Sequence, residues 1–317
     1  MNNFLAQCVH QLDLALDQIS IKDTNYDRFA LILIDNAVEL ALHNYAESYK
    51  HNLKKLYKDD KEKYKKVRKA QGNSFYDKLS LVECDSLITH KHKTSINLLH
   101  KFRNEAYHAG LVHDKIMHSL TIFYFKIACD VFITLYNYDT CIYNKDNIPY
   151  RAFKYISLKN KFNFIHVWCK LKEIIEINEN TLINDLSSNM LSIINRTDIN
   201  IEFLGQHSPG IEGRNQAVIW SQVLPTIFHE GDFNTFDPTE KLLKSTIENG
   251  TLRFKKDPID NWRKQYGILI MAKDEHNALN LYCEFIEETR GFCKIIQDRK
   301  NELEQILEDE YQDSKGN

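Results

Sequence analysis

The residues best suited to chemistry lie close together in the stretch Leu98 to Gly110, LLHKFRNEAYHAG. Arg103 is a permanent cation, and its planar fork of donors fits a phosphate group. His108, five positions later, has a side-chain type that gives or takes a proton near neutral pH. Together these two residue types could bind a phosphodiester and move the proton whose transfer breaks it.

This arginine-x4-histidine spacing, with Asn104 directly after the arginine, resembles the signature of the HEPN superfamily. HEPN proteins are small helical domains that are often ribonucleases. The resemblance covers residues 1–140 and implies a metal-independent endoribonuclease without a cofactor. It implies that Arg103 holds the scissile phosphate, that His108 acts as general acid and base, and that Asn104 bonds the phosphate or orients its neighbours.

The same resemblance implies a biological setting and a partner. HEPN ribonucleases place the motif where the third long helix gives way to the fourth, and dimers form the cleft. Such domains commonly serve in toxin–antitoxin or phage-defence systems. The expected partners are therefore RNA, a second copy of this chain, and an antitoxin or another defence-system protein.

The elements that position the motif are expected to be helices throughout. No proline precedes Pro149, and the first 200 residues contain only two glycines, Gly72 and Gly110. Such a stretch forms long helices without interruption. We therefore expect an all-α protein, with a four-to-five-helix bundle in residues 1–140 and a mostly helical accessory domain in residues 156–317.

Two carboxylates on the second helix are candidate supporting residues. The segment FALILIDNAVELALH is apolar nearly all round, which predicts a helix at the bundle centre, and Asp35, Glu39 and His43 form one polar stripe along it. The stripe is either a solvent edge or a set of groups that orient Arg103 or His108. Arg103 itself falls on the buried side of its helix, where a structural ion pair with Asp35 or Glu39 is the alternative to a cleft. Tyr107 is a further supporting candidate.

Arg103 and His108 are about 140° apart on a continuous helix. They converge if the helix ends near Tyr107, which Ala109 and Gly110 permit, or if each protomer of a dimer supplies one of them. The spacing thus favours a homodimer.

A strongly basic segment follows the second helix. Lys50–Lys69 carries ten Lys or Arg against three Asp or Glu, with Tyr57 and Tyr64 between them. Such a segment could track a phosphate backbone while the tyrosines stack on bases. Alternatively it is a solvated extension of helix two, held by pairs such as Asp59–Lys63 and Glu62–Lys66. The candidate RNA-binding residues are Lys54, Lys55, Lys58, Lys65, Lys66 and Arg68.

The spacing of apolar residues and the positions of Gly, Pro and capping residues predict where the remaining helices and loops begin and end. In the N-terminal part we expect helices at Asn3–Ile19, from Tyr26, at Asp77–Ile88, at Ile96–Tyr107 after a Thr94 or Ser95 cap, and at Lys115–Tyr136 after an Asp114 cap. A domain boundary is expected at Thr140–Tyr155. Beyond it we expect helices at Leu158–Ile177, Thr181–Ile194, Asn215–Phe228 and Pro238–Glu248, a loop at Gly205–Gly213, a short strand at Tyr266–Ala272, and one long helix at Asp274–Tyr311.

Several other classes of protein do not fit the sequence. Seven scattered cysteines without a C-x-x-C pair indicate a reducing compartment and argue against a disulfide framework. Six of thirteen histidines lie between His90 and His118, but their spacing does not suit a metal site. The Gly205–Gly213 segment lacks the Lys and Ser or Thr of a phosphate loop. The N-terminus lacks a basic leader and no uncharged apolar run approaches a membrane span, so we expect a cytoplasmic protein without a membrane partner.

The sequence therefore leads to one principal hypothesis and two alternatives. The principal one is a dimeric endoribonuclease that uses the 2′-hydroxyl of RNA as nucleophile. The first alternative is a non-catalytic HEPN-like module that binds RNA or protein, with Arg103 in a structural role. The second is a purely helical scaffold.

Overall fold

The computed structural model describes residues 2–109, 113–137, 148–155, 164–177, 181–208, 213–223 and 254–316 of the chain, without the side chains of residues 2, 3, 52, 108, 109 and 316. The expected helix Pro238–Glu248 lies outside these residues. The chain divides into two compact units, Met1–Asp185 with Asp274–Asn280 and Leu186–Lys273 with Leu281–Asn317. The described residues form helices and no strand, which confirms the all-α prediction.

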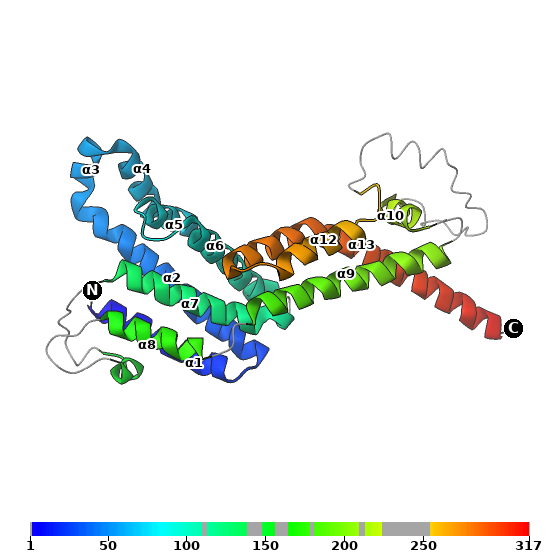
Figure 1. The fold of residues 1–317 in the computed structure, drawn as a ribbon, viewed down its shortest axis with the longest axis horizontal. Coiled ribbons are helices and arrows are strands. Elements are labelled where there is room, and N and C mark those ends of the chain that lie inside the picture. The colour runs from blue at the N-terminus through cyan, green and yellow to red at the C-terminus, as the bar shows by residue number, and fades with distance from the viewer. Residues whose placement is uncertain are drawn as a thin grey trace. The chain divides into compact units, whose positions relative to one another are not determined.

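The first unit contains the four long helices that the sequence predicts, together with shorter ones (Figure 1). Its α-helices are α1 (Asn2–Ser20), α2 (Thr24–Ser48), α3 (Leu53–Asp59), α4 (Lys61–Ala70), α5 (Phe75–Cys84), α6 (His90–Ala109), α7 (Met117–Leu135) and α8 (Phe164–Glu176). Short 3-10 turns lie at Tyr49–Asn52, Asp114–Ile116 and Tyr150–Lys154. Helix α2 contacts α1, α4, α5, α6 and α7, so it holds the central position expected of it.

Side chains that accept backbone hydrogen bonds set where these helices begin. Asp23, Asp60 and Ser74 cap α2, α4 and α5 by accepting from Asn25, Lys63 and Asp77. Thr89 does the same for α6, since its Oγ1 accepts from the backbone N–H of His92. The expected cap at Thr94 or Ser95 is therefore wrong. The apolar periodicity starts only at Ile96, whereas the helix itself begins at His90, directly after the Thr89 cap.

Helix α7 fills the core of the first unit. Fourteen of its 19 residues are buried, among them Tyr124, Phe125 and Phe132. The stretch Asp114–Leu135 has the length and apolar character of a membrane span, yet 78% of its apolar window is buried inside the protein. This burial fits the core helix of a soluble protein.

The basic segment does not extend α2, so that part of the interpretation is wrong. The chain bends through the turn Tyr49–Asn52 and folds back as α3 and α4, which contact each other. Asp60 breaks the helix because its side chain caps α4. The expected Lys63 and Glu62 pairs are replaced by Lys63–Asp85 and Lys65–Glu62.

Three polar contacts anchor residues 113–118, at the start of α7. His113, with a φ of 80°, places its Nε2 2.7 Å from Oε2 of Glu105 on α6. Asp114 binds Arg28 of α2 at 2.8 Å and does not cap a helix as expected. His118 places its Nδ1 2.9 Å from Oδ1 of the buried Asp27. The contacts with Arg28 and Asp27 hold the start of α7 against α2, and the contact with Glu105 ties it to α6.

The first unit continues past the boundary that the sequence suggests. The turn Tyr150–Lys154 is tied to α1, because the buried Asp13 accepts hydrogen bonds from Arg151, Lys154 and Tyr155. Burial alone would raise the pKa of Asp13, but these three donors hold it below its ordinary value. Helix α8 also packs on α7, where Trp168 stacks on Phe132 at 4.4 Å. The division therefore falls at Asp185 rather than at 140–155.

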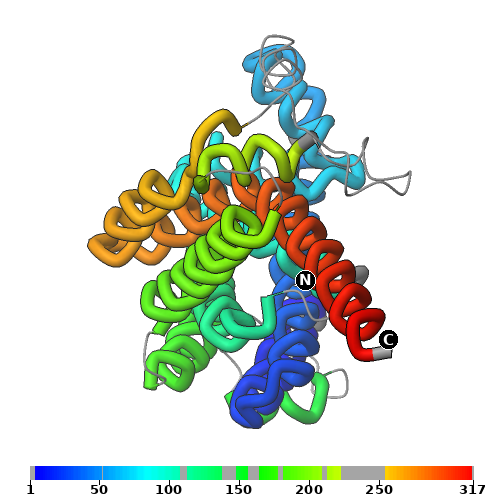
Figure 2. The backbone as a smooth tube through the Cα atoms, turned by 90° about the vertical axis from the view of Figure 1, so that its right-hand side faces the viewer, coloured from blue at the N-terminus to red at the C-terminus, as the bar shows by residue number. Residues whose placement is uncertain are grey.

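The second unit is built on α9 (Leu182–His207), α10 (Arg214–Val223), α12 (Ile259–Ile270) and α13 (Glu275–Gly316), whose path Figure 2 traces. Asn189 bonds Tyr282 and Asn200 bonds Gln297, so α9 and α13 run parallel. Helix α13 buries Tyr282, Phe285, Phe292, Ile296 and Leu303. The expected strand at Tyr266–Ala272 is wrong, because α12 turns Trp262 onto Phe285 and Phe292. Helix α9 also continues through His207 into the expected loop.

The His118–Asp27 pair predicts how stability depends on pH. The hydrogen bond to Asp27 raises the pKa of His118 above its ordinary value, although burial opposes this. The folded state therefore binds this proton more tightly than the unfolded chain, whose histidines titrate near ~6.5. The stabilisation is complete below that pH and is lost as the pH rises through the raised pKa.

We expect the free energy of unfolding of the wild-type chain to fall between pH 6 and 9 more steeply than that of His118→Gln. Urea denaturation at each pH measures this difference. His43→Gln on α2, where the side chain is exposed, is the matched control and should keep the wild-type slope. Equal slopes in all three proteins would contradict the assignment.

Candidate active site

The carboxylate of Asp35 is the centre of a charged cluster in the first unit. Its side chain is 0% exposed, on the central helix α2. It accepts a hydrogen bond from the Tyr124 hydroxyl of α7 at 2.7 Å. Burial and the neighbouring Asp35 charge raise the pKa of Tyr124 well above its ordinary value, so the phenol stays protonated and donates. A buried anion of this kind requires such donors and a cation.

Arg103 supplies the cation from α6. Its Nε lies 3.3 Å from Oδ2 of Asp35, a distance that makes an ion pair without the alignment of a hydrogen bond. Its Nη1 donates to Oδ1 of Asn104 at 2.8 Å. The side chain is 27% exposed, and Nη2 has no hydrogen-bond partner among the described residues. One edge of the guanidinium is therefore held by the protein, while the other remains available to a ligand.

Three members of this cluster were not singled out from the sequence. His100 places its Nδ1 3.0 Å from both oxygens of Asp35, and the ring of Phe75 stacks on it at 4.0 Å. Tyr124 is the third. A signal for His100 was present, since it precedes Arg103 by three residues and so shares its helix face. Nothing in the sequence pairs Phe75 or Tyr124 with that face.

Glu39 and Tyr107 lie at the margin of the cluster. Oε1 of Glu39 is 4.0 Å from the Lys78 ammonium of α5, and Lys78 is 4% exposed. The two interpretations of the polar stripe on α2 each hold for part of it. Asp35 is buried in the cluster, Glu39 is half-buried, and His43 is exposed to solvent. Tyr107 is 69% exposed, one turn beyond Arg103.

The side chain of His108 lies outside the described residues, but the backbone around it is helical. Helix α6 runs to Ala109 and does not end near Tyr107. Because the helix is continuous from Arg103 to His108, the two positions are separated by about 140° around its axis. Within one protomer they therefore leave the helix in different directions.

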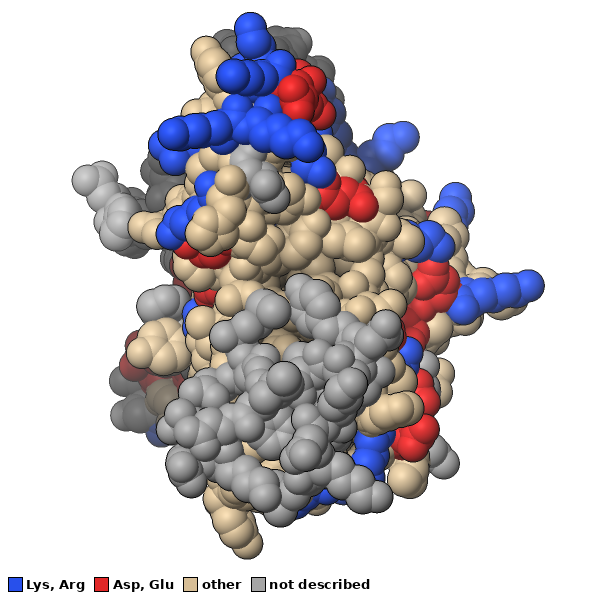
Figure 3. All heavy atoms as spheres, turned by 90° about the vertical axis from the view of Figure 1, so that its left-hand side faces the viewer, with Lys and Arg blue, Asp and Glu red and all other residues tan. Residues whose placement is uncertain are grey.

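The candidate RNA-binding residues lie on an exposed hairpin. Figure 3 shows Lys and Arg side chains gathered over α3 and α4. Lys54, Lys55 and Lys58 line an open hollow of about 620 Å³ with Leu53, Tyr57 and Tyr64. The two tyrosine rings meet edge to face at 5.1 Å. The remaining candidates, Lys65, Lys66 and Arg68, are exposed on α4.

A polar clamp fixes the base of this hairpin. Asp85, at the end of α5, accepts hydrogen bonds from Tyr45 at 2.7 Å and Tyr49 at 2.6 Å, and pairs with Lys63 of α4 at 2.6 Å. Burial alone would raise the pKa of Asp85, but these donors hold it below its ordinary value. Nothing in the sequence pattern indicated this clamp. It holds the exposed lysines on a base that is packed against α2.

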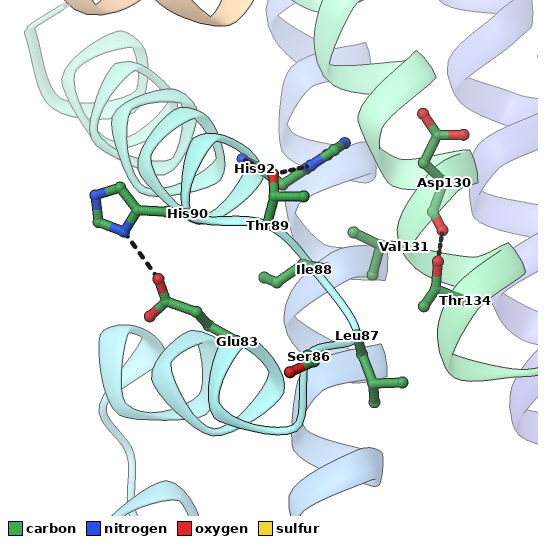
Figure 4. Close-up of a pocket in the computed structure, with 10 residues that line it drawn as sticks. All are labelled: Glu83, Ser86, Leu87, Ile88, Thr89, His90, His92, Asp130, Val131 and Thr134. Carbon is green, nitrogen blue, oxygen red and sulfur yellow. Dashed lines mark hydrogen bonds and ion pairs between the residues drawn. The ribbon is translucent and has the colours of Figure 1, made fainter.

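A separate pocket of about 420 Å³ lies where α5, α6 and α7 meet (Figure 4). It contains two of the clustered histidines, but they do not converge. His90 binds Glu83 at 2.8 Å and His92 binds Thr89 at 2.7 Å. Among the described residues no group of three His, Cys, Asp or Glu side chains is arranged to hold a metal ion.

The buried position of Asp35 predicts a large loss of stability when its charge is removed. Asp35→Ala leaves Arg103, His100 and Tyr124 without their shared acceptor, and breaking a buried pair costs about 3–5 kcal/mol. Asp35→Asn keeps the size of the side chain and should lose less. Urea denaturation measures both.

Asp59→Ala, at an exposed carboxylate on α3, is the control and should change the free energy of unfolding by about 0.5 kcal/mol or less. An Asp35→Ala protein as stable as this control would show that the cluster is not important for folding.

Comparisons with protein families, with curated proteins and with solved structures find no match for this chain. The residues themselves are therefore the guide to function. They place a partly exposed arginine in a buried polar cluster and, on the same unit, a basic hairpin.

Proposed function

We propose that this chain is a metal-independent endoribonuclease of the HEPN type, acting as a toxin or an anti-phage effector. The observation that carries the proposal is the state of Arg103. Its Nε faces Asp35, its Nη2 has no hydrogen-bond partner in the described part of the chain, and its side chain is partly exposed. A guanidinium held on one side is suited to bind a phosphate on the other. The resemblance of residues 103–108 to the HEPN signature adds the reaction class.

In this proposal Arg103 holds the scissile phosphate and offsets the charge that develops in the transition state. Asn104, bonded to Nη1, orients the guanidinium. His108 moves a proton as general acid or base. The nucleophile is the 2′-hydroxyl of the substrate, so the products carry a 2′,3′-cyclic phosphate and a 5′-hydroxyl.

The proposal includes a homodimer and a controlling partner. Because α6 continues through His108, residues 103 and 108 of one protomer diverge, and a second copy is one way to bring them together. An antitoxin or another defence-system protein is the proposed regulator. Residues 156–317 are proposed as the accessory part that recognises a trigger, a partner or the RNA.

The Arg103–Asp35 pair also favours a second candidate. A non-catalytic module that binds RNA or protein would use the same pair as a structural ion pair, with no reaction at Nη2. The two candidates differ in what Arg103→Ala does. A structural role predicts a loss of stability, whereas a catalytic role predicts a loss of cleavage beyond any loss of stability.

The reaction is tested on purified full-length chain with synthetic RNA in excess EDTA. We expect cleavage that leaves 2′,3′-cyclic phosphate ends, none on DNA of the same sequence, and none where the cut site carries 2′-O-methyl. Arg103→Ala should lower the rate by about 100-fold or more, because it removes a transition-state contact. Mass spectrometry of the product ends and a time course measure both.

Lys101→Ala, an exposed cation on the same helix, is the matched control and should cleave at the wild-type rate. Cleavage that needs Mg²⁺ or leaves a 5′-phosphate contradicts the mechanism. Melting curves of Arg103→Ala separate its stability from its activity.

The basic hairpin predicts RNA affinity without sequence choice. Replacing Lys54, Lys55 and Lys58 together by Gln should weaken binding to all single-stranded RNAs and flatten the salt dependence. Because the three substitutions remove three cations that face phosphates, the slope of log affinity against log salt should fall by about 2. Fluorescence anisotropy on a labelled 2′-O-methyl oligonucleotide, which is not cut, measures this change.

The control carries the same charge change at three exposed lysines of the second unit, Lys264, Lys273 and Lys294. It should leave the slope unchanged. Equal slopes for the two triple variants would show that the hairpin is a solvated surface that does not contribute to RNA binding.

A further inference from the structure

His100 and Arg103 are joined by one carboxylate. Nδ1 of His100 and Nε of Arg103 lie 3.0 Å and 3.3 Å from oxygens of the same buried Asp35. The two residues are three positions apart on α6, so they project from the same face of the helix. A proton-transfer group and a phosphate-binding group are thus neighbours within one protomer.

The hydrogen bond to Asp35 selects the tautomer of the imidazole. A carboxylate only accepts hydrogen bonds, so Nδ1 of His100 must be the nitrogen that carries the proton in the neutral ring. The lone pair is then on Nε2. Within the described part of the chain Nε2 has no hydrogen-bond partner, and the side chain is 20% exposed.

The ring of His100 is also held in one plane. Phe75 of α5 stacks on it with centroids 4.0 Å apart and an angle of 9° between the rings. Asp35, which orients the other edge, is itself fixed by the Tyr124 hydroxyl. Packing and hydrogen bonds that lock a side chain in this way prepare it for a reaction.

A purely structural histidine accounts for less of this arrangement. A structural role requires only the bond between Nδ1 and Asp35. Nε2 has no protein partner among the described residues and is not enclosed, so it is open to a ligand as well as to water. Asp35 does not need His100 for charge balance either, because Arg103 already provides a cation. The features left over are an oriented Nε2 lone pair and a neighbouring guanidinium.

We propose that His100, oriented by Asp35, is the general base of this site. The inference rests on the proposed ribonuclease function. Nε2 takes the proton of the RNA 2′-hydroxyl as the O2′–P bond forms and the P–O5′ bond breaks. The leaving O5′ takes a proton from His108 or from water, and His100 returns its proton to solvent. Asp35 is a positioning residue in this step, since it acts through the imidazole.

The rate should depend on pH through this base. A general base reacts in its unprotonated form, so the rate of the wild-type chain should rise with pH from the acid side. Among the described residues, the charged and titratable groups linked to Asp35 around this ring are Arg103 of α6 and Tyr124 of α7. Glu39 of α2 acts on Tyr124, and Lys78 of α5 lies next to Glu39. A variant without the imidazole should lose the rise at acid pH.

The experiment compares the full-length wild type, His100→Asn, His100→Ala and His90→Asn on the same RNA from pH 5 to 9. We expect a loss of about 100- to 10,000-fold in the cleavage rate of His100→Asn, the range of general base catalysis. The rise at acid pH should disappear in that variant. Free imidazole added to His100→Ala should restore part of the rate. His90→Asn, at an exposed histidine on the same helix, should match the wild type.

The possible outcomes separate this inference from the proposed function. Wild-type cleavage that His100→Asn retains, with its rise at acid pH intact, overturns the role of His100 and leaves the ribonuclease standing. A His100→Ala protein that binds 2′-O-methyl RNA normally but gains nothing from imidazole also overturns it. A wild-type chain that leaves RNA intact overturns both proposals. Rescue by imidazole supports it even if the variants are less stable, because a structural loss is not repaired by a free base.

Discussion

The burial of one carboxylate constrains most of the first unit. Asp35 has no contact with solvent, and an isolated charge in such a place is too costly to persist. The fold compensates it from α6 through His100 and Arg103, and from α7 through Tyr124. These donors must reach the carboxylate together, so the relative positions of α2, α6 and α7 are tied to a single group. The same requirement that holds the core together therefore brings a histidine and an arginine onto one face of α6.

The sequence predicted the helical framework better than the contacts between helices. The absence of proline and the near absence of glycine before residue 149 identify the long helices, because nothing interrupts their hydrogen bonding. The sequence also identified Arg103 and named Asp35 as its possible partner. It did not single out His100, although the three-residue spacing from Arg103 places both on one helix face. It placed the cap of α6 at Thr94 or Ser95 rather than Thr89, because the apolar stripe begins later than the backbone helix. The strand expected at Tyr266–Ala272 is helical, because contacts of Trp262 with α13 decide where a short apolar run lies.

The basic hairpin shows how local and tertiary terms combine. Helix propensity alone would continue α2 through Lys50–Lys69, since lysine and glutamate are good helix formers. Asp60 instead caps the new helix α4. Asp85 accepts hydrogen bonds from Tyr45 and Tyr49 and pairs with Lys63 of α4. This clamp gathers lysines that repel one another onto a fixed base, and it leaves Tyr57 and Tyr64 beside them. The charges and the aromatic rings could be read from the sequence, but the pairing with Asp85 at the end of α5, which fixes the fold of the segment, could not.

The continuity of α6 bears on how any chemistry at the motif is organised. Positions 103 and 108 lie about 140° apart around the unbroken helix α6, so the motif spacing alone does not bring the two together within one protomer. A pair three residues apart does, and here that pair shares an acceptor that fixes both side chains. If cleavage occurs as proposed, Arg103 is common to both arrangements, His100 takes a proton from the 2′-hydroxyl, and His108 gives one to the leaving oxygen. An acid and a base on separate faces suit a reaction in which one proton leaves the nucleophile and another reaches the departing oxygen. The helix that separates the motif residues within one protomer would then keep the two proton transfers apart.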